Sequence, residues 1–184
     1  IMQSGRELFA QHGPEAQMDE IAAHAGVGIG TVYRHFPTKE ALLTEMVRAR
    51  FQEFAEIATA AEDIADPLDA LEVVIRRSAE AVEGDSGFQL AMMGSSELEW
   101  EGIEQQKAAL AEVVGRIIAR AAAAGVVRDD FVFEDFGMVM CGITATMYYQ
   151  PGGASWHRHM EIILRGICAP ASEAAVAGAV AVHP

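Results

Sequence analysis

The spacing of apolar residues constrains this chain more than any other feature. Apolar side chains recur at intervals of three and four residues along most of its 184 positions, whereas alternation of apolar and polar residues is scarce. The first pattern is typical of amphipathic helices and the second of half-buried strands. We therefore predict an all-α fold. The hydrophobic content of 51% is enough for a core and too high for a disordered protein.

Glycine and proline residues divide this pattern into segments. The side chains of Thr38 and Asp66 are of the kind that caps helix N-termini. Pro67 stands at a first helical position, where the backbone N–H makes no hydrogen bond within the helix and a proline is therefore tolerated. Gly26 can adopt the left-handed backbone of a tight turn. Residues after 169 receive no prediction. The first predicted helix ends near residue 11. The others cover about 18–25, 29–35, 38 to past 55, 67–83, 88–93, 95 or 96 to 124, 132–149 and 155–168.

Charge is distributed unevenly. The whole chain has 27 acids against 13 bases, and a net charge of −14 predicts repulsion from nucleic acids and anionic membranes. Residues 1–50, however, hold five bases and six acids, and no acid occurs between Ile21 and Lys39. This pattern indicates a small anion-binding element attached to an acidic body.

Several classes of protein are excluded or disfavoured. The longest uncharged run, 136–157, is interrupted at Gln150-Pro151-Gly152-Gly153, so we expect no membrane segment. Cys141 and Cys168 have no partner at ligand spacing, which favours buried thiols in a reducing cytoplasm. Because Ile1 begins in the middle of a helical pattern, we expect residues upstream of it.

Residues 17–36 have the pattern of a helix-turn-helix. In such a unit the second helix enters the major groove of DNA and the first supports it. The predicted small core comprises Ile21, Ala22, Ala25, Val27, Val32 and Phe36.

The second helix of this unit carries the candidate DNA-binding side chains. Arg34 is the candidate for a guanine edge, Ile29 could contact a thymine methyl group, and Lys39 could neutralise a phosphate. Small residues at the start of the helix would allow its backbone to approach a phosphate. Each of these residues, taken singly, is more often packing or solvated surface. The predicted DNA-binding residues are Gly28, Ile29, Gly30, Thr31, Tyr33, Arg34, His35 and Lys39.

Four stretches of the first quarter of the chain carry a family resemblance: Leu8-Phe9-Ala10-Gln11-His12-Gly13, Met18-Asp19-Glu20-Ile21-Ala22, Ala25-Gly26-Val27, and Gly30-Thr31-Val32-Tyr33-Arg34-His35-Phe36-Pro37-Thr38-Lys39-Glu40-Ala41-Leu42-Leu43. Together they resemble the N-terminal domain of the TetR family. The resemblance implies a homodimeric, all-helical transcriptional regulator, most often a repressor released from palindromic operator DNA by a small molecule. By position it implies recognition-helix contacts at Gly30, Thr31, Tyr33 and His35 and a phosphate contact at Lys39. The chain departs from the family pattern at Gln17, Gly28 and Ile29, which bears on the operator sequence.

The resemblance also implies two domains. We predict a helix-turn-helix DNA-binding domain over 1–47 and a helical ligand-binding and dimerisation domain over 48–184. The segments 132–149 and 155–168 are broadly apolar, and we expect them to form the homodimer interface. An apolar or aromatic effector would fit a pocket of methionine and aromatic side chains, although such residues at helical spacing are more often core. The candidate pocket residues are Met92, Met93, Trp100, Met140, Met147 and Tyr148.

No catalytic arrangement, cofactor motif or metal site is predicted. His157 and His159 are two positions apart, so their imidazoles point to different faces of a helix. We therefore expect no enzymatic activity. The alternative from another class is a helical-bundle carrier or enzyme that contains only a corner resembling a helix-turn-helix.

Overall fold

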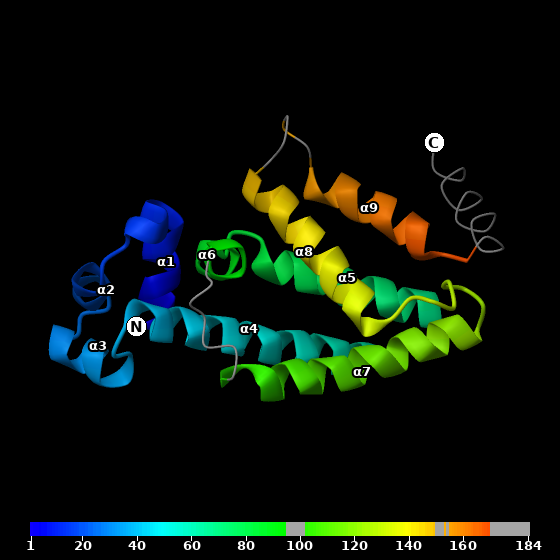
Figure 1. The fold of residues 1–184 in the computed structure, drawn as a ribbon, viewed down its shortest axis with the longest axis horizontal. Helices are drawn as coiled ribbons and strands as arrows, with labels where there is room; N and C mark the ends of the chain where they lie inside the picture. Colours follow the sequence, from blue (N-terminus) through cyan, green and yellow to red (C-terminus); the bar gives the residue numbers. More distant parts are fainter. Residues whose placement is uncertain (95–101, 150–152, 154, 170–184) are drawn as a thin grey trace. The chain divides into compact units, whose positions relative to one another are not determined.

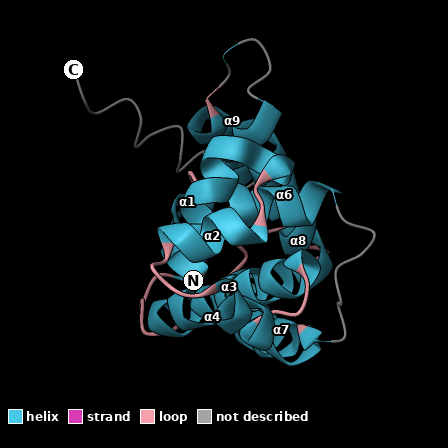
Figure 2. Ribbon diagram, turned by 90° about the vertical axis from the view of Figure 1, so that its left-hand side faces the viewer, coloured by secondary structure: helices cyan, strands magenta, loops and turns pink. Residues whose placement is uncertain are grey.

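The computed structural model describes residues 1–94, 102–149, 153 and 155–169. In this part of the chain all regular elements are helices, apart from one isolated bridge between Val127 and Cys168 (Figures 1 and 2). Among the described helices none is both long and apolar enough to cross a membrane. The predicted all-α fold is confirmed.

The chain divides into two compact units, one formed by 1–53 with 81–108 and the other by 54–80 with 109–184. The first unit contains α1, the 3₁₀ helix η1, α2, α3, α6 and the beginnings of α4 and α7. In it α1 packs against α2, η1 and α6, and α2 packs against α3. The bounds are α1 Met2–His12, η1 Gly13–Glu15, α2 Met18–His24, α3 Ile29–His35, α4 Lys39–Ala61, α6 Ser86–Gly94 and α7 Glu104–Ala123.

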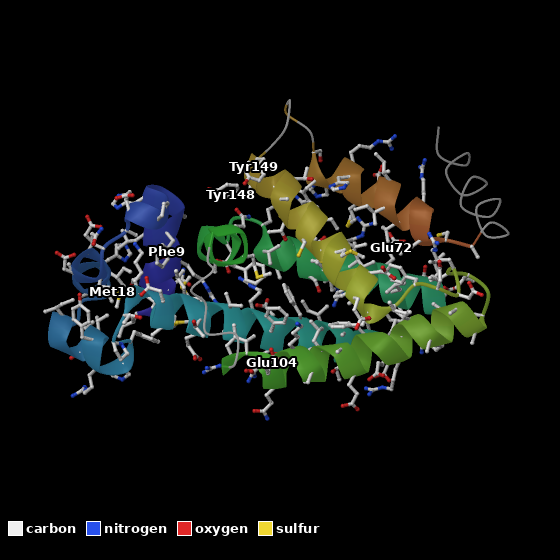
Figure 3. All side chains as sticks on the ribbon, in the orientation of Figure 1. Phe9, Met18, Glu72, Glu104, Tyr148 and Tyr149 are labelled. Atoms are coloured by element: carbon white, nitrogen blue, oxygen red, sulfur yellow. The ribbon has the colours of Figure 1, made fainter. Side chains whose placement is uncertain are left out.

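Local signals explain where the helices of the first unit begin and end. Gly13 ends α1 with a positive φ of 56°. The Thr38 side-chain oxygen accepts the N–H of Ala41 at 3.1 Å, as predicted for the cap of α4. Side chains such as Phe9 and Met18, labelled in Figure 3, are buried in this unit. The domain boundary predicted near residue 47 falls inside α4 and stays a prediction.

The second unit holds the end of α4, most of α5 (Pro67–Val82) and of α7, and all of α8 (Phe133–Tyr149) and α9 (Trp156–Ile167). Asp66 caps α5 by accepting the N–H groups of Leu68 at 2.8 Å and Asp69 at 3.1 Å. Helices α8 and α9 pack side by side (Figure 1). The predicted range 132–149 begins one residue before the observed α8, and the predicted range 155–168 extends one residue beyond α9 at each end.

Two arginines of α7 bind the segment that follows α4. Arg116 donates to the two carboxylate oxygens of Glu62 at 2.8 and 3.0 Å. Arg120 donates to the backbone carbonyls of Glu62 at 2.8 Å and Ile64 at 3.0 Å. Carbonyls in the turn after a helix lack a partner within the helix, and the Arg120 guanidinium supplies one.

Three sequence predictions about packing and helix ends were wrong or fall outside the described residues. Val27, predicted in the small core, is 36% exposed because it follows the turn and lies beyond the packed face of α2. Cys141 is exposed and Cys168 half-buried, since α8 and α9 do not cover their whole apolar surface. Helix α7 begins at Glu104, later than predicted, and its predicted caps, Ser95 and Ser96, lie outside the described residues.

Candidate nucleic-acid interface

A tight turn connects α2 to α3. The N–H of Gly26 donates to the carbonyl of Ala23 at 3.1 Å, and the N–H of Val27 donates to that of Ala22 at 3.0 Å. Gly26 has a φ of 67°, in the left-handed region. This pair of hydrogen bonds is the Schellman arrangement, which ends a helix and turns the chain sharply. The predicted role of Gly26 is thereby confirmed.

One buried side chain attaches α3 to its unit. Val32 is fully buried, whereas Ile29 is 41% and Tyr33 49% exposed. Ile29 and Tyr33 are four residues apart, as are Gly30 and Arg34, so the four positions form one continuous surface of the helix. Arg34 and His35 are exposed and Thr31 is half-buried. Apart from the buried Val32, the helix thus presents large and hydrogen-bonding side chains to solvent.

The backbone at the start of α3 is uncovered. A Cβ atom added to Gly28 or Gly30 would meet nothing within 4 Å. Gly28 is the N-cap residue, with φ −67° and ψ 142°, and no side chain caps the helix there. A flat molecular surface could therefore come close to the main chain at this point.

The imidazole of His35 is held by its own helix. Its Nδ1 lies 2.8 Å from the carbonyl oxygen of Thr31, one turn earlier, and the residue is exposed. The contact restricts rotation of the ring and leaves Nε2 as the polar atom at the outer edge.

Lys39 is partly engaged within the protein. Its ammonium group donates to the carbonyl of Pro14 and lies 6.0 Å from the centroid of the Phe9 ring. The residue is half-buried. An ammonium group has three donors, so the hydrogen bond to Pro14 leaves others for a phosphate. The sequence did not indicate this contact, because 25 positions separate the two residues.

Two acids of α1 and α2 face imidazoles. Glu20 of α2 lies 3.5 Å from His12, and Glu7 of α1 lies 3.4 Å from His24. Glu20 also accepts the N–H of Gln17 at 3.1 Å, which supports the start of α2. These contacts join α1 to α2, the helix on which α3 packs.

The described part of the structure does not bring the predicted pocket residues together in one site. On α8, Met147 is buried, Met140 is half-buried and Tyr148 is exposed, with its ring at an edge-on angle to that of Tyr149 (Figure 3). Met92 is half-buried in the other compact unit. The side chain of Met93 and all of Trp100 lie outside the described part of the chain. The pocket stays a prediction.

Comparison with known proteins gives matches over both parts of the chain. A family model described as bacterial regulatory proteins, tetR family, matches residues 1–46. A second model, described as transcriptional regulator SbtR-like, C-terminal domain, matches residues 66–169, more than half of the chain.

Two curated relatives match over shorter stretches. The HTH-type transcriptional repressor LfrR of Mycolicibacterium smegmatis is 33% identical over 82 residues, which are 44% of this chain and 41% of that protein. The fatty acid metabolism regulator protein of Bacillus subtilis is 31% identical over 108 residues, 56% of this chain and 54% of that protein. The chain thus spans about half the length of these curated relatives.

Solved structures match over nearly the whole chain. The TetR transcription regulatory protein of Mycobacterium vanbaalenii is 30% identical, with 91% of this chain and 92% of that chain covered and a TM-score of 0.58. The TetR regulator SCO0520 of Streptomyces coelicolor is 25% identical, with coverages of 92% and 97% and a TM-score of 0.65. FadR of Bacillus subtilis, solved with stearoyl-CoA, shares the fold at 20% identity, coverages of 89% and 93% and a TM-score of 0.70. The resemblance found in the sequence is confirmed: the chain belongs to the tetR family of bacterial regulatory proteins.

Proposed function

We propose that this protein is a DNA-binding transcriptional regulator, acting as a repressor in the cytoplasm and without catalytic activity. The observation that carries the proposal is the exposed surface of α3, with Tyr33, Arg34 and His35 presented from a segment that contains no acid. Guanidinium, phenol and imidazole groups bind phosphates and base edges. This surface would enter the major groove, with Gly28 and Gly30 allowing the backbone to come close.

The active form in this proposal is a homodimer. Large apolar side chains are exposed on the two helices expected to meet a second copy: Val132, next to the start of α8, Met138 on α8 and Ile162 on α9. Burying such surface is the main favourable term in association. Two copies of α3 would then occupy successive major grooves roughly 34 Å apart, which requires a palindromic operator.

The proposal also includes release from DNA by an apolar or aromatic effector. The stearoyl-CoA complex of FadR supports it, since that protein of the same fold binds a ligand with a long apolar chain. Met140 and Met147 lie seven positions apart on α8 and so share one face of it, which suits an adaptable apolar wall. An effector would act by binding one of two arrangements of the helices more tightly than the other, with α4 as the element that moves.

The test begins with duplexes selected from a random library by the wild-type protein. Fluorescence anisotropy at fixed salt should show tight binding of a palindromic sequence, and Tyr33→Ala with Arg34→Ala should abolish it. Arg77→Ala is the matched control, since Arg77 is an exposed arginine of α5 outside the proposed interface. The proposal would be contradicted if Arg77→Ala lost binding while the double variant kept it. It would also be contradicted if the wild-type protein selected no sequence from the library.

The rival function, a helical-bundle carrier or enzyme with an accidental helix-turn-helix, is not favoured. Both matching family models describe regulators, and together they cover most of the chain. The effector is tested separately by thermal shift, because a ligand of the folded state raises the melting temperature. Stearoyl-CoA is the first probe, and it should also weaken operator binding.

A further inference from the structure

We infer that His35 contacts DNA as an imidazolium ion whose Nε2–H donates to a phosphate oxygen, so that operator binding takes up a proton at each recognition helix. The inference rests on the proposed DNA-binding function and adds to it the protonation state of one contact. Its origin is the hydrogen bond between His35 and Thr31.

The hydrogen bond determines which ring nitrogen carries a proton. A backbone carbonyl oxygen can only accept, so His35 Nδ1, 2.8 Å from the Thr31 oxygen, must donate to it. A neutral imidazole has one N–H, and here that N–H is used within the helix. Nε2 of the neutral ring is therefore an acceptor, and it becomes a donor only when the ring is protonated.

The position of His35 favours a phosphate as its partner. In helix-turn-helix proteins the N-terminal residues of the recognition helix contact base edges. His35 is the last residue of α3, and its exposed ring lies beyond the first-turn residues. Phosphate oxygens only accept hydrogen bonds, and the neutral ring offers them a lone pair. A favourable contact therefore requires the imidazolium form, which the C-terminal end of a helix also favours.

Other charged groups near α3 define the controls. Arg34 precedes His35 on the same helix, and Lys39 and Glu40 begin α4. Helix α2, which packs against α3, carries Asp19, Glu20 and His24. His24 faces Glu7 at 3.4 Å and His12 faces Glu20 at 3.5 Å, and both imidazoles lie outside the proposed interface.

Proton uptake predicts both the direction and the size of the change in operator affinity with pH. Histidine side chains ordinarily titrate near pH 6.5. A ring that is neutral in the free protein must acquire a proton on binding, so the operator Kd should increase with pH by up to about tenfold per unit for each recognition helix. Anisotropy titrations of the selected operator between pH 6 and 8, at constant salt, measure this slope.

His35→Gln and His24→Gln separate the sources of the slope. The amide of glutamine donates at every pH, so His35→Gln should bind with a nearly constant Kd over this range. His24→Gln should keep the wild-type slope. A slope that is absent in the wild type, or that survives in His35→Gln and disappears in His24→Gln, would overturn the inference while leaving DNA binding intact. Failure to bind at any pH would instead contradict the proposed function.

A measurement without DNA tests the tautomer. Nitrogen-15 NMR of labelled histidines in the free protein at pH 8 should show His35 protonated at Nδ1, assigned by its loss in His35→Gln. A ring protonated at Nε2 would overturn the inference.

Discussion

The guanidinium group of Arg50 donates to the carboxylate of Asp85, and both residues are only 6% exposed. Arg50 belongs to α4, and Asp85 directly precedes α6 in the same compact unit. The second oxygen of Asp85 accepts the N–H of Phe88 at 3.0 Å, so one carboxylate both caps α6 and joins it to α4. Arg6 of α1 lies 3.8 Å from the oxygen that Arg50 binds.

Replacing Asp85 by alanine should destabilise the protein strongly. Arg50 would keep a buried charge without its main partner and α6 would lose its cap, a change that typically costs about 3–5 kcal/mol. Urea denaturation followed by circular dichroism measures the free energy of unfolding. Glu161→Ala, which breaks the exposed pair with Arg158, is the control and should have a much smaller effect. Equal losses in the two variants would contradict the buried role of Asp85.

Gly26→Ala should also destabilise the fold, by about 1–2 kcal/mol. A Cβ at this position would meet no atom within 4 Å, so the cost would come from the backbone φ of 67° alone. Gly26→Asn should cost less, because asparagine tolerates the left-handed region. Gly115→Ala is the matched control within α7, where the added methyl group also meets nothing and should stabilise the helix by up to about 1 kcal/mol. Thermal melting of the three variants gives the comparison.

Gly30→Ala should separate stability from DNA binding. The change adds helix propensity at an open position of α3 and should raise the melting temperature slightly. It also places a methyl group on the surface proposed to approach DNA, so the operator Kd should increase. Anisotropy and thermal melting on the same sample measure both effects. Unchanged affinity would indicate that the main chain at residue 30 stays away from DNA.

The pair formed by Glu62 and Arg116 should stabilise the protein at neutral pH and not at acid pH. The hydrogen bonds from the Arg116 guanidinium hold the pKa of Glu62 below its ordinary value of 4.5. The folded carboxyl group is therefore more acidic than the unfolded one. Its contribution is present above the unfolded pKa and is lost as the pH falls through the lowered one.

Glu62→Gln should consequently reduce the difference in melting temperature between pH 7 and pH 3. Since both side chains are solvated, the effect should be small and should shrink further in 1 M salt. Glu80→Gln, an exposed substitution on α5, is the control for general loss of charge. An identical pH profile in both variants would contradict this role for the pair.

Ile162→Glu should weaken the proposed homodimer. Ile162 is 56% exposed on α9, and a carboxylate buried between two copies would have no partner. Sedimentation velocity should show a shift towards monomer, accompanied by weaker operator binding. Ala60→Glu, at an exposed position of α4, should leave the assembly unchanged. A dimer that tolerates Ile162→Glu would exclude this face as the interface.

The helices and their ends followed from short stretches of sequence. Apolar spacing predicted α8 and α9 to within one residue at each end, and the caps at Thr38 and Asp66 and the turn at Gly26 are present as expected. Each depends on contacts between residues only a few positions apart. The side chains proposed to meet DNA could be named for the same reason, because Val32 is the one buried position of this seven-residue helix and leaves most of the others at its surface.

Other features depend on residues that are distant along the chain. The contacts of Lys39 with Pro14 and of Arg50 with Asp85, and the exposure of Val27 and Cys141, were not predictable from local pattern. The residues that flank a lysine, an acid or a cysteine along the chain do not show whether its side chain is solvated or buried. Local hydrogen bonds and helical periodicity thus specify which helices form and where they stop. Burial and long-range pairing arise only when the helices pack, because they depend on which distant surfaces exclude water from one another.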